Sequence, residues 1–271
     1  MLCAMSDSES DRKERAQTGQ DLLEVEAAGA GPEAVAALVL GAGRGERLGH
    51  ALPKAFVPLL GQTLVERSIR TLAQSGAVGW IQPVLDAGEF DRFKDLKLQD
   101  IRQLAPPIAG GYERQDSMRA GLASLPNEIR WVAVHDAARC LVSTADVARV
   151  IAIARQTGAA ILAERVRDTI KRVVDGKIVE TPPRENCWAA QTPQVMRRDW
   201  LANALDKAAA GDRVATDDAE ILEWAGYPVA IVEALSANPK ITRPEDLVAA
   251  EAIASAVPAE QVRALEKGKA G

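Results

Sequence analysis

A glycine-rich loop near the start of the chain has the residues best suited to binding phosphate. Gly41, Gly43 and Gly45 stand at alternate positions after an apolar run, and two cations, Arg47 and Lys54, follow. Glycine allows the backbone to turn and to approach a ligand closely, so its N–H groups can surround an anion. A helix start and fixed cations behind such a loop attract further negative charge. The pattern therefore predicts a site for a polyphosphate.

Two common phosphate-binding patterns do not fit this loop. The P-loop ends in Gly-Lys-Ser or Gly-Lys-Thr, whereas this loop ends in Gly-Glu-Arg. The dinucleotide fingerprint Gly-x-Gly-x-x-Gly fails as well, because Glu46 or Leu48 occupies its last position. A nicotinamide-dependent dehydrogenase is therefore disfavoured. What remains is Gly-x-Gly-x-Arg followed by Pro-Lys.

Two further polar clusters follow predicted strands. The first begins at Gly110 and reads GGYERQDS, and the second begins at His135 and reads HDAAR. Ligands gather at the carboxyl ends of strands in an open α/β sheet, so we expect the first cluster and the glycine loop to face one crevice. Asp136 can take a hard divalent cation that neutralises nucleotide phosphates. We assign His135 no chemistry, because a lone histidine after an apolar strand is typical of packing.

Several other charged residues have ordinary structural explanations when each is taken alone. The stretch from residue 166 to 188 alternates β-branched and polar residues around Asp175-Gly176, which predicts a protruding β-arm. Its cations are typical of a solvated hairpin face. Thr216-Asp217-Asp218 resembles a helix cap in which both aspartates serve the helix dipole. Lys240 precedes a helix start and is consistent with a surface lysine.

Composition limits the class of protein. The chain has 271 residues, 47% of them hydrophobic, so it can bury a sizeable core and form one large domain or two small ones. A net charge of −5 without a basic run argues against a nucleic-acid partner, and the short apolar runs argue against a membrane span. Three cysteines and two histidines make a zinc site improbable and indicate a reducing compartment, so we expect a cytoplasmic protein.

The elements that must position these residues alternate between strand and helix. This order predicts an α/β fold, with a mostly parallel sheet covered by helices on both faces. We expect residues 1–33 to be a flexible leader, 34–258 one domain with the arm inserted at about 165–189, and 259–271 a tail. Pro83 should make its strand irregular or place it at an edge. We expect strands near 35–40, 79–85, 106–109, 131–134, 159–162 and 228–232, and helices over 64–75, 91–104, 113–125, 144–157, 198–210 and 217–225 and after Arg243.

Taken together, the clusters resemble one family from Ala36 to about Glu251. The stretches that match the 2-C-methyl-D-erythritol 4-phosphate cytidylyltransferases occur in family order: GAGRGER…PK, GGYERQDS, VHDAAR, VRDTIKR, the segment from Arg184 to Trp188, QTPQ, TDDA and NPKITRPEDL. The resemblance implies a Rossmann-like nucleotidyltransferase. It would couple CTP to a pentitol phosphate, in the presence of Mg²⁺, on the non-mevalonate route to isoprenoids.

The resemblance also implies roles for particular residues. Arg47 and Lys54 would stabilise the transition state, and Asp136 would lie by the ribose and hold Mg²⁺. The arm would cross to a neighbouring subunit of a homodimer. The residues implied for CTP are Gly41, Ala42, Gly43, Gly45, Gly111, Ser117, Asp136 and Ala137. Those implied for the pentitol phosphate are Thr169, Arg184, Thr192, Thr216 and Lys240.

Three positions depart from the family pattern, and two other functions remain open. Tyr112 stands where a small or acidic residue is common, Cys140 where a proline is common, and Pro239 where an aliphatic residue is common. The first could alter contacts to the base, and the other two concern loop geometry. A cytidylyltransferase acting on ribitol 5-phosphate would share the fold and loops. A CTP-binding regulator without turnover would have lost Arg47, Lys54 or Asp136, and all are present.

Overall fold

The computed structural model describes residues 33–43 and 45–256. The predicted leader, apart from Glu33, and the predicted tail lie outside these residues.

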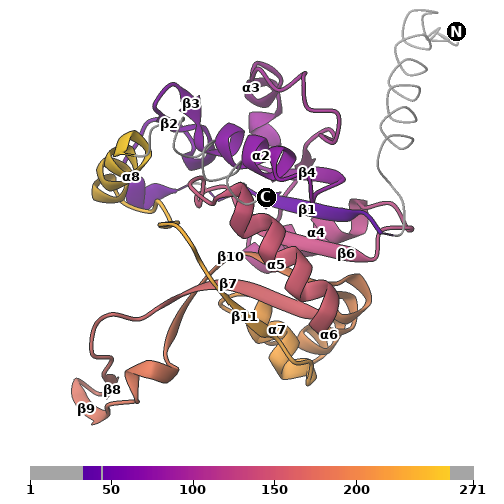
Figure 1. Ribbon diagram of the computed structural model, residues 1–271. Coiled ribbons are helices and arrows are strands. Elements are labelled where there is room, and N and C mark those ends of the chain that lie inside the picture. Colours follow the sequence, from indigo (N-terminus) through magenta and orange to yellow (C-terminus); the bar gives the residue numbers. More distant parts are fainter. Residues whose placement is uncertain (1–32, 44, 257–271) are drawn as a thin grey trace, which may run out of the picture.

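A seven-stranded sheet forms the centre of the described structure, in the order β11-β7-β10-β6-β1-β4-β5 (Figure 1). All neighbouring pairs are parallel except those made by β10, which runs antiparallel to both β6 and β7. This confirms the expected α/β fold with a mostly parallel, mixed sheet. The strands of the sheet are β1 (Val35–Leu40), β4 (Trp80–Leu85), β5 (Ile108–Ala109), β6 (Trp131–Asp136), β7 (Ala159–Arg165), β10 (Trp188–Arg197) and β11 (Ala230–Glu233).

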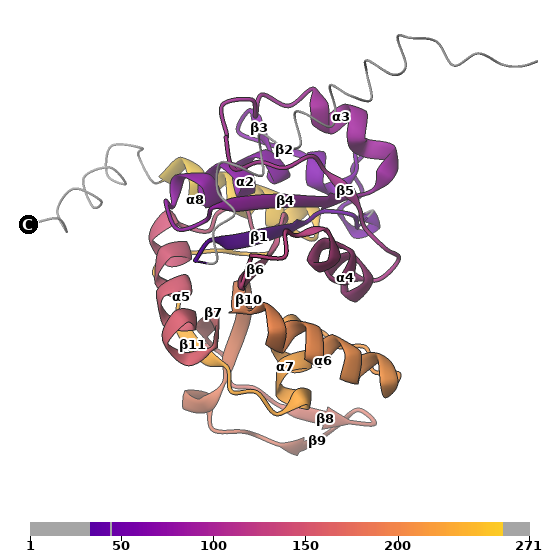
Figure 2. The same ribbon diagram turned by 90° about the vertical axis from the view of Figure 1, so that its right-hand side faces the viewer.

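Helices cover both faces of the sheet, and successive residues of β1 point into two separate cores. Val35, Ala37 and Val39 pack in the core under α2 and α5, whereas Ala36 and Leu38 pack in the core under α4, α6 and α7. Figure 2 shows α5 on one side of the sheet and α6 and α7 on the other. The α-helices of these layers are α2 (Leu64–Gln74), α3 (Phe90–Lys94), α4 (Arg114–Ser124), α5 (Thr144–Thr157), α6 (Arg198–Ala210) and α7 (Asp218–Ala225).

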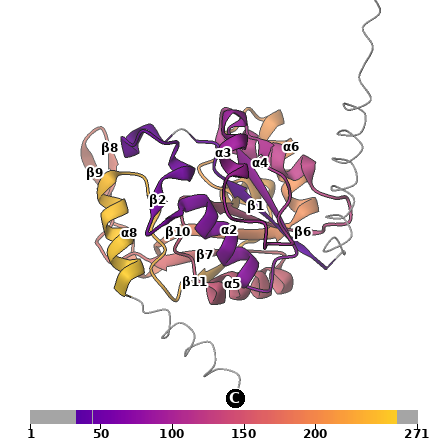
Figure 3. The ribbon, with the colours of Figure 1, turned by 90° about the horizontal axis from the view of Figure 1, so that it is seen from above.

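Two elements lie beside the main layers. The strands β2 (Pro58–Leu59) and β3 (Gln62–Thr63) form a hairpin, and its β2 strand contacts α8 (Pro244–Ala256), which Figure 3 shows beside β2 from above. The predicted arm is the hairpin of β8 (Arg172–Val174) and β9 (Lys177–Glu180), which projects away from the sheet (Figure 1). Short 3₁₀ turns connect other elements: η1 (Glu46–Leu48), η2 (Lys54–Phe56), η3 (Ala87–Glu89) and η4 (Arg184–Asn186).

The structure corrects two expectations about elements and adds two elements. The helix expected over 91–104 ends at Lys94, because the chain must then run beside β4, where Ile81 donates to the Gln103 carbonyl. The strand that contains Pro83 is neither irregular nor at an edge, because the register of β4 with β1 continues unbroken through Pro83 and β4 lies between β1 and β5. Because β5 pairs only with Val84 and Leu85, no ladder bond to β5 is lost at Pro83. The long strand β10 and the small β2–β3 hairpin were not predicted.

In the described part of the chain, no helix is both long and apolar enough to cross a membrane.

Candidate active site

The site lies where the carboxyl ends of β1 and β6 meet. A cavity of about 120 Å³, here called the glycine-loop cavity, opens beside β1. A second cavity of about 230 Å³, here called the threonine cavity, opens beside β10. Asp136 and Lys240 line both cavities, so the two meet at this pair. The glycine-loop cavity is lined by Leu40, Gly41, Gly43, Lys54, Ala55, Asp136, Ala137, Ala138 and Lys240, and the threonine cavity by Arg114, Asp136, Arg139, Ala190, Gln191, Thr192, Gln194, Thr216, Asp217 and Lys240.

The glycines of the loop are required for different reasons. Gly45 has a φ of +69°, and an added Cβ would lie 2.3 Å from the Cβ of Lys54. An added Cβ at Gly41 would lie 2.8 Å from the side chain of Leu85. At Gly43 a Cβ would meet nothing within 4 Å, so packing does not explain this glycine. Gly43 instead borders the glycine-loop cavity and a neighbouring cavity of about 300 Å³, where a bare backbone leaves space for a ligand.

The second glycine loop lies directly against the first, as expected for one shared crevice. An added Cβ at Gly110 would lie 2.5 Å from the Cβ of Ala42. The buried hydroxyl of Ser117 accepts a hydrogen bond from the Gly111 N–H at 3.1 Å, which holds the loop over the start of α4. Tyr112 is 98% exposed, so this departure from the family pattern makes little contact with the described residues.

Asp136 is held by a cation on each of its carboxylate oxygens. Arg114 Nε lies 3.2 Å from Oδ1, and Lys240 Nζ lies 2.7 Å from Oδ2. Burial alone would raise the pKa of the Asp136 carboxyl, but Arg114 and Lys240 hold that pKa well below its usual range. Asp136 is therefore an anion across the physiological range. Lys240 is placed beside it because the Ile241 N–H donates to the Ala138 carbonyl at 2.9 Å.

Lys54 is a partly buried cation whose positive charge is not fully balanced by the acidic residues around it. Burial, together with the positive charges of Lys240 and Arg47, lowers its pKa to about 8, and Asp136 only partly opposes this change. Arg47 is exposed and does not line the glycine-loop cavity, yet its charge is close enough to act on Lys54. An anion bound here would relieve the repulsion among these cations.

The threonine cavity contains the predicted Thr192 and Thr216, but both hydroxyls already have partners. Thr192 Oγ1 accepts from the Asp136 N–H at 3.1 Å, and Thr216 Oγ1 donates to Glu220 at 2.8 Å. Arg139 spans the cavity wall by donating to the carbonyls of Asn238 and Ala190. The Arg139 Nε atom is buried and has no partner among the described residues, which is a feature that a bound anion would satisfy.

His135 has a structural role, as expected. It is completely buried, and its Nδ1 forms a 3.1 Å hydrogen bond with Thr192 Oγ1. Burial lowers the pKa of His135 to about 4, although Asp136 opposes this change. The imidazole is therefore neutral near pH 7.

The structure does not bring the two predicted arm residues to this site. Thr169 and Arg184 are exposed and line neither the glycine-loop cavity nor the threonine cavity. Arg184 Nη1 instead donates to the Arg167 carbonyl within the arm at 2.8 Å.

Sequence reasoning overlooked a buried ion pair in the site. Asp218 lies in the first turn of α7, as expected for a residue that serves the helix dipole, but it has a second role: its carboxylate is fully buried and receives two hydrogen bonds from Arg114. Asp217 alone caps α7, by accepting from the Glu220 N–H. Arg114 and Asp218 are far apart in the chain, and each belongs to a local pattern that explains it, so no sequence signal connected them.

The donor set around Asp136 can be tested against a divalent cation. In the described residues no group of three or more His, Cys, Asp or Glu side chains could enclose a metal. Mg²⁺ is commonly held by one or two carboxylates together with substrate phosphates, rather than by a protein cage. The buried carboxylate of Asp136 borders both cavities, so it fits a metal of that kind, which would share the carboxylate with Arg114 and Lys240.

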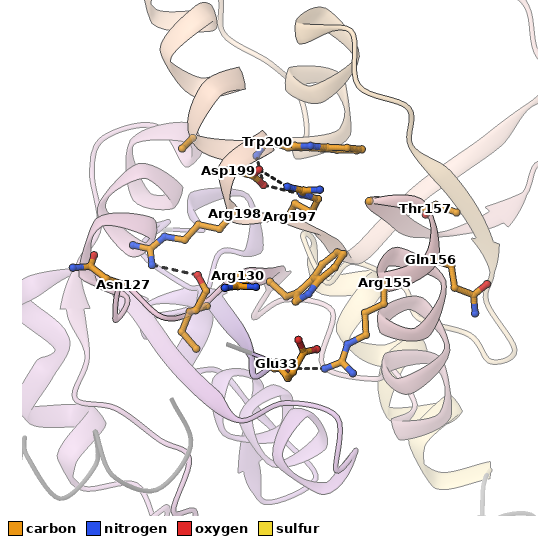
Figure 4. A pocket seen from close by; sticks show the side chains of 14 residues that line it. Glu33, Asn127, Arg130, Arg155, Gln156, Thr157, Arg197, Arg198, Asp199 and Trp200 are labelled. Atoms are coloured by element: carbon orange, nitrogen blue, oxygen red, sulfur yellow. Dashed lines mark hydrogen bonds and ion pairs between the residues drawn. The ribbon is translucent and has the colours of Figure 1, made fainter. Parts of the chain in front are cut away.

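A larger cavity of about 930 Å³ lies near the amino end of β6 (Figure 4). Three of the arginines that line it are engaged in structural contacts: Arg155 donates to the Glu33 carbonyl, Arg197 pairs with Asp199, and Arg198 donates to carbonyls after α4. Because Asp136 ends β6 at the opposite edge, this cavity does not belong to the phosphate site.

An α/β sheet with a glycine loop after β1, a carboxylate at the end of β6 and clustered cations defines a nucleotidyltransferase-like protein. Comparison with known proteins identifies the family within this class. The family model for IspD, 2-C-methyl-D-erythritol 4-phosphate cytidylyltransferase, matches residues 35–256. The chain therefore belongs to this cytidylyltransferase family.

Individual relatives agree with that assignment. The 2-C-methyl-D-erythritol 4-phosphate cytidylyltransferase of Pelotomaculum thermopropionicum is 41% identical over 86% of this chain and 98% of its own. The crystal structure of the enzyme of that name from Thermus thermophilus has a TM-score of 0.68 at 32% identity, covering 82% of this chain and 99% of its own. The 4-diphosphocytidyl-2C-methyl-D-erythritol synthase of Anaerococcus prevotii has a TM-score of 0.74 at 25% identity, covering 83% and 99%.

Proposed function

We propose that the protein transfers the cytidylyl group of CTP to 2-C-methyl-D-erythritol 4-phosphate. An oxygen of the acceptor phosphate forms a bond to the α-phosphorus of CTP. The bond from that phosphorus to the oxygen of the β-phosphate breaks, and pyrophosphate leaves with the electron pair. A phosphate monoester is already ionised near pH 7, so the reaction needs no strong general base. A site whose one histidine is buried and neutral is consistent with this chemistry.

The main observation in support of this proposal is that two cavities suited to anions share Asp136 and Lys240 in their walls. Two anions must approach each other while negative charge builds on the α-phosphoryl oxygens and the leaving group. Lys54 lies on the glycine-loop side, Arg139 lies on the threonine side, and Lys240 lies on both. CTP in the first cavity and the acceptor phosphate in the second would come together at this shared boundary.

The glycine-loop side would hold CTP. Gly41, Ala42, Gly43 and Gly45 would surround the phosphates, and Arg47 and Lys54 would stabilise the transition state. Gly111 and Ser117 would lie by the cytosine, and Asp136 and Ala137 by the ribose. Asp136 would hold Mg²⁺ jointly with the phosphates, and the metal would supply charge neutralisation on the phosphoryl oxygens.

The threonine side would hold the acceptor phosphate through Thr192, Thr216 and Lys240. We place Thr169 and Arg184 at the corresponding site of a second subunit, in a homodimer joined by the arm. Exposed β-branched residues on the arm support this assembly, because large apolar side chains in water are unfavourable without a partner. Those more than a third exposed are Ile170, Val173, Val174, Ile178 and Val179.

We also propose a cytoplasmic location and a domain over about residues 34–258. The low cysteine content supports a reducing compartment, and Cys140 and Cys187 are free thiols in the described structure. The net charge of −5 supports the absence of a nucleic-acid partner.

A pyrophosphate-release assay with CTP and Mg²⁺ tests the function. Turnover is expected with methylerythritol phosphate, and much less with ribitol 5-phosphate or with other nucleoside triphosphates. Turnover with ribitol 5-phosphate alone would favour the sister enzyme. Binding of CTP without turnover on either acceptor would favour a regulator.

The Lys54→Ala variant tests the site itself. Turnover is expected to fall by about 10²–10³-fold with the fold intact, because one well-placed charge donor is removed from the transition state. Lys94→Ala removes an exposed lysine on α3 and is the matched control. Near-normal turnover of the Lys54 variant would defeat the assignment.

A further inference from the structure

The guanidinium of Arg114 joins two carboxylates that come from different elements. Its Nη1 and Nη2 donate to Asp218 Oδ1 and Oδ2 at 2.6 and 2.9 Å, and its Nε donates to Asp136 Oδ1 at 3.2 Å. The fixed fork of an arginine can hold both partners at once, which the single ammonium of a lysine cannot do in the same geometry. Arg114 therefore links the end of β6 to the start of α7.

The Asp218 end of this bridge is fixed by β10. The N–H groups of Asp218 and Ala219 donate to Gln194 Oε1 at 3.1 and 2.9 Å. The amide nitrogen of Gln194 in turn donates to Asp217 Oδ2 at 3.0 Å. Gln194 is 1% exposed, so the start of α7 is held by a buried side chain of the central sheet.

The Asp136 end of the bridge lies at the boundary of the two cavities. With Arg114 on Oδ1 and Lys240 on Oδ2, both oxygens of the carboxylate have a set direction. A buried ion pair contributes little net stability compared with well-packed apolar residues, so stability alone is a weak reason for this arrangement.

We infer that Arg114, locked in place by Asp218, is a positioning residue that orients Asp136 and, through Asp136, Lys240. The inference rests on the proposed function, in which Asp136 and Lys240 contact the reacting groups. Arg114 and Asp218 act on the reaction only through these two residues. A displacement of about 1 Å at reacting groups can reduce a rate by roughly 10²-fold, so a positioning role of this kind has a measurable size.

The double variant Arg114→Gln/Asp218→Asn provides the test. Removing Arg114 alone would leave the Asp218 carboxylate buried without a partner, which could unfold the protein. The double variant removes both charges, so no unpaired carboxylate is left buried at position 218. Arg119→Gln is the matched control, because Arg119 lies on the same helix, pairs with exposed Asp206 and lines neither cavity.

We expect the folded double variant to lose about 10²-fold in kcat with a much smaller change in KM, and the control to lose neither. The single variant Arg114→Lys is expected to have a kcat between that of the double variant and that of the wild type, since lysine keeps the charge but cannot bridge both carboxylates. A lowered melting temperature with kcat within about threefold of wild type would assign a merely structural role and overturn the inference.

A crystal structure of the double variant gives a readout independent of turnover. The carboxylate of Asp136 is expected to move by about 1 Å, and its 2.7 Å contact with Lys240 to change. If Asp136 occupies the same position in the double variant as in the wild type, the inference is overturned, even when the wild-type protein turns over normally. Wild-type protein without turnover would instead contradict the proposed function, so the two failures can be told apart.

Discussion

At the scale of single residues, Lys54 connects pH to activity. Because its pKa is lowered to about 8, Lys54 loses its positive charge as the pH rises through that value. We therefore expect kcat/KM for CTP, which reports on the free enzyme, to fall above about pH 8. Lys54→Arg keeps its charge at that pH and should lack this fall. An identical alkaline limb in that variant would assign the titration to another group.

The same pKa predicts the opposite trend for stability. Folding lowers the pKa of Lys54 from 10.5 to about 8, so between these values the unfolded chain binds more protons than the folded chain. The contribution of Lys54 to the free energy of unfolding therefore rises from about pH 8 to pH 10.5. Denaturant titrations across this range, compared with Lys54→Met, isolate that contribution.

Two glycines of the loop separate a structural role from a binding role. Gly45→Ala should lower both the melting temperature and kcat. The backbone at position 45 has a positive φ, which alanine adopts only with strain, and the new Cβ would collide with Lys54. Gly43→Ala should leave the melting temperature unchanged and raise KM for CTP, because its Cβ enters open space beside the cavity. Calorimetry and steady-state kinetics on both variants check this contrast. Equal effects would contradict it.

The glycine loop and Asp136 could be predicted from the sequence because each is a local pattern at the end of an apolar strand. The bridge from Arg114 to Asp218 could not, since the two residues are 104 positions apart. Each of them also has a sufficient local explanation, at a helix start. The pairing becomes visible only in the structure, where Gln194 of β10 holds the start of α7 and Arg114 donates to Asp218.

At the scale of elements, the arm makes a prediction about assembly. Ile178 is 63% exposed on β9, and a charge there should weaken any interface that buries it. We expect Ile178→Asp to shift the protein from dimer to monomer in sedimentation velocity experiments. Val248→Asp on α8, which is 68% exposed, is the control for a charge on an exposed valine. A wild-type monomer would exclude the arm-mediated dimer.

The hydrophobic pattern predicted most helices and parallel strands but missed β10. This strand contains Pro193 and the polar Gln191, Thr192 and Gln194, and it has few of the β-branched residues that mark a strand. Its side chains instead make specific hydrogen bonds, such as that from the Asp136 N–H to Thr192. The residues that weaken the strand signal here are the ones that shape the threonine cavity.

At the scale of the whole molecule, the direction of β10 determines where the arm is attached. Because β10 is antiparallel to β6 and β7, its first residues lie at the same edge of the sheet as the last residues of those strands. Trp188 pairs with Arg165, so both ends of the arm start from the edge that carries Asp136.

Mixed dimers test whether two chains share a site. If the arm reaches a neighbouring site, Lys54→Ala and Arg184→Ala chains should be inactive separately. Mixing them should recover about a quarter of the wild-type turnover, since half the dimers are then mixed and each has one intact site. Lys54→Ala mixed with Lys240→Ala should recover nothing, because both residues serve the same chain's cavities. Failure of the first mixture would contradict a shared site.

Because the arm is attached at the edge that carries Asp136 and would complete a neighbouring chain's site, specific activity would depend on the protein concentration. Each chain would lack part of its own machinery, so specific activity would decline on dilution as protomers separate, while CTP affinity would persist in the isolated chain.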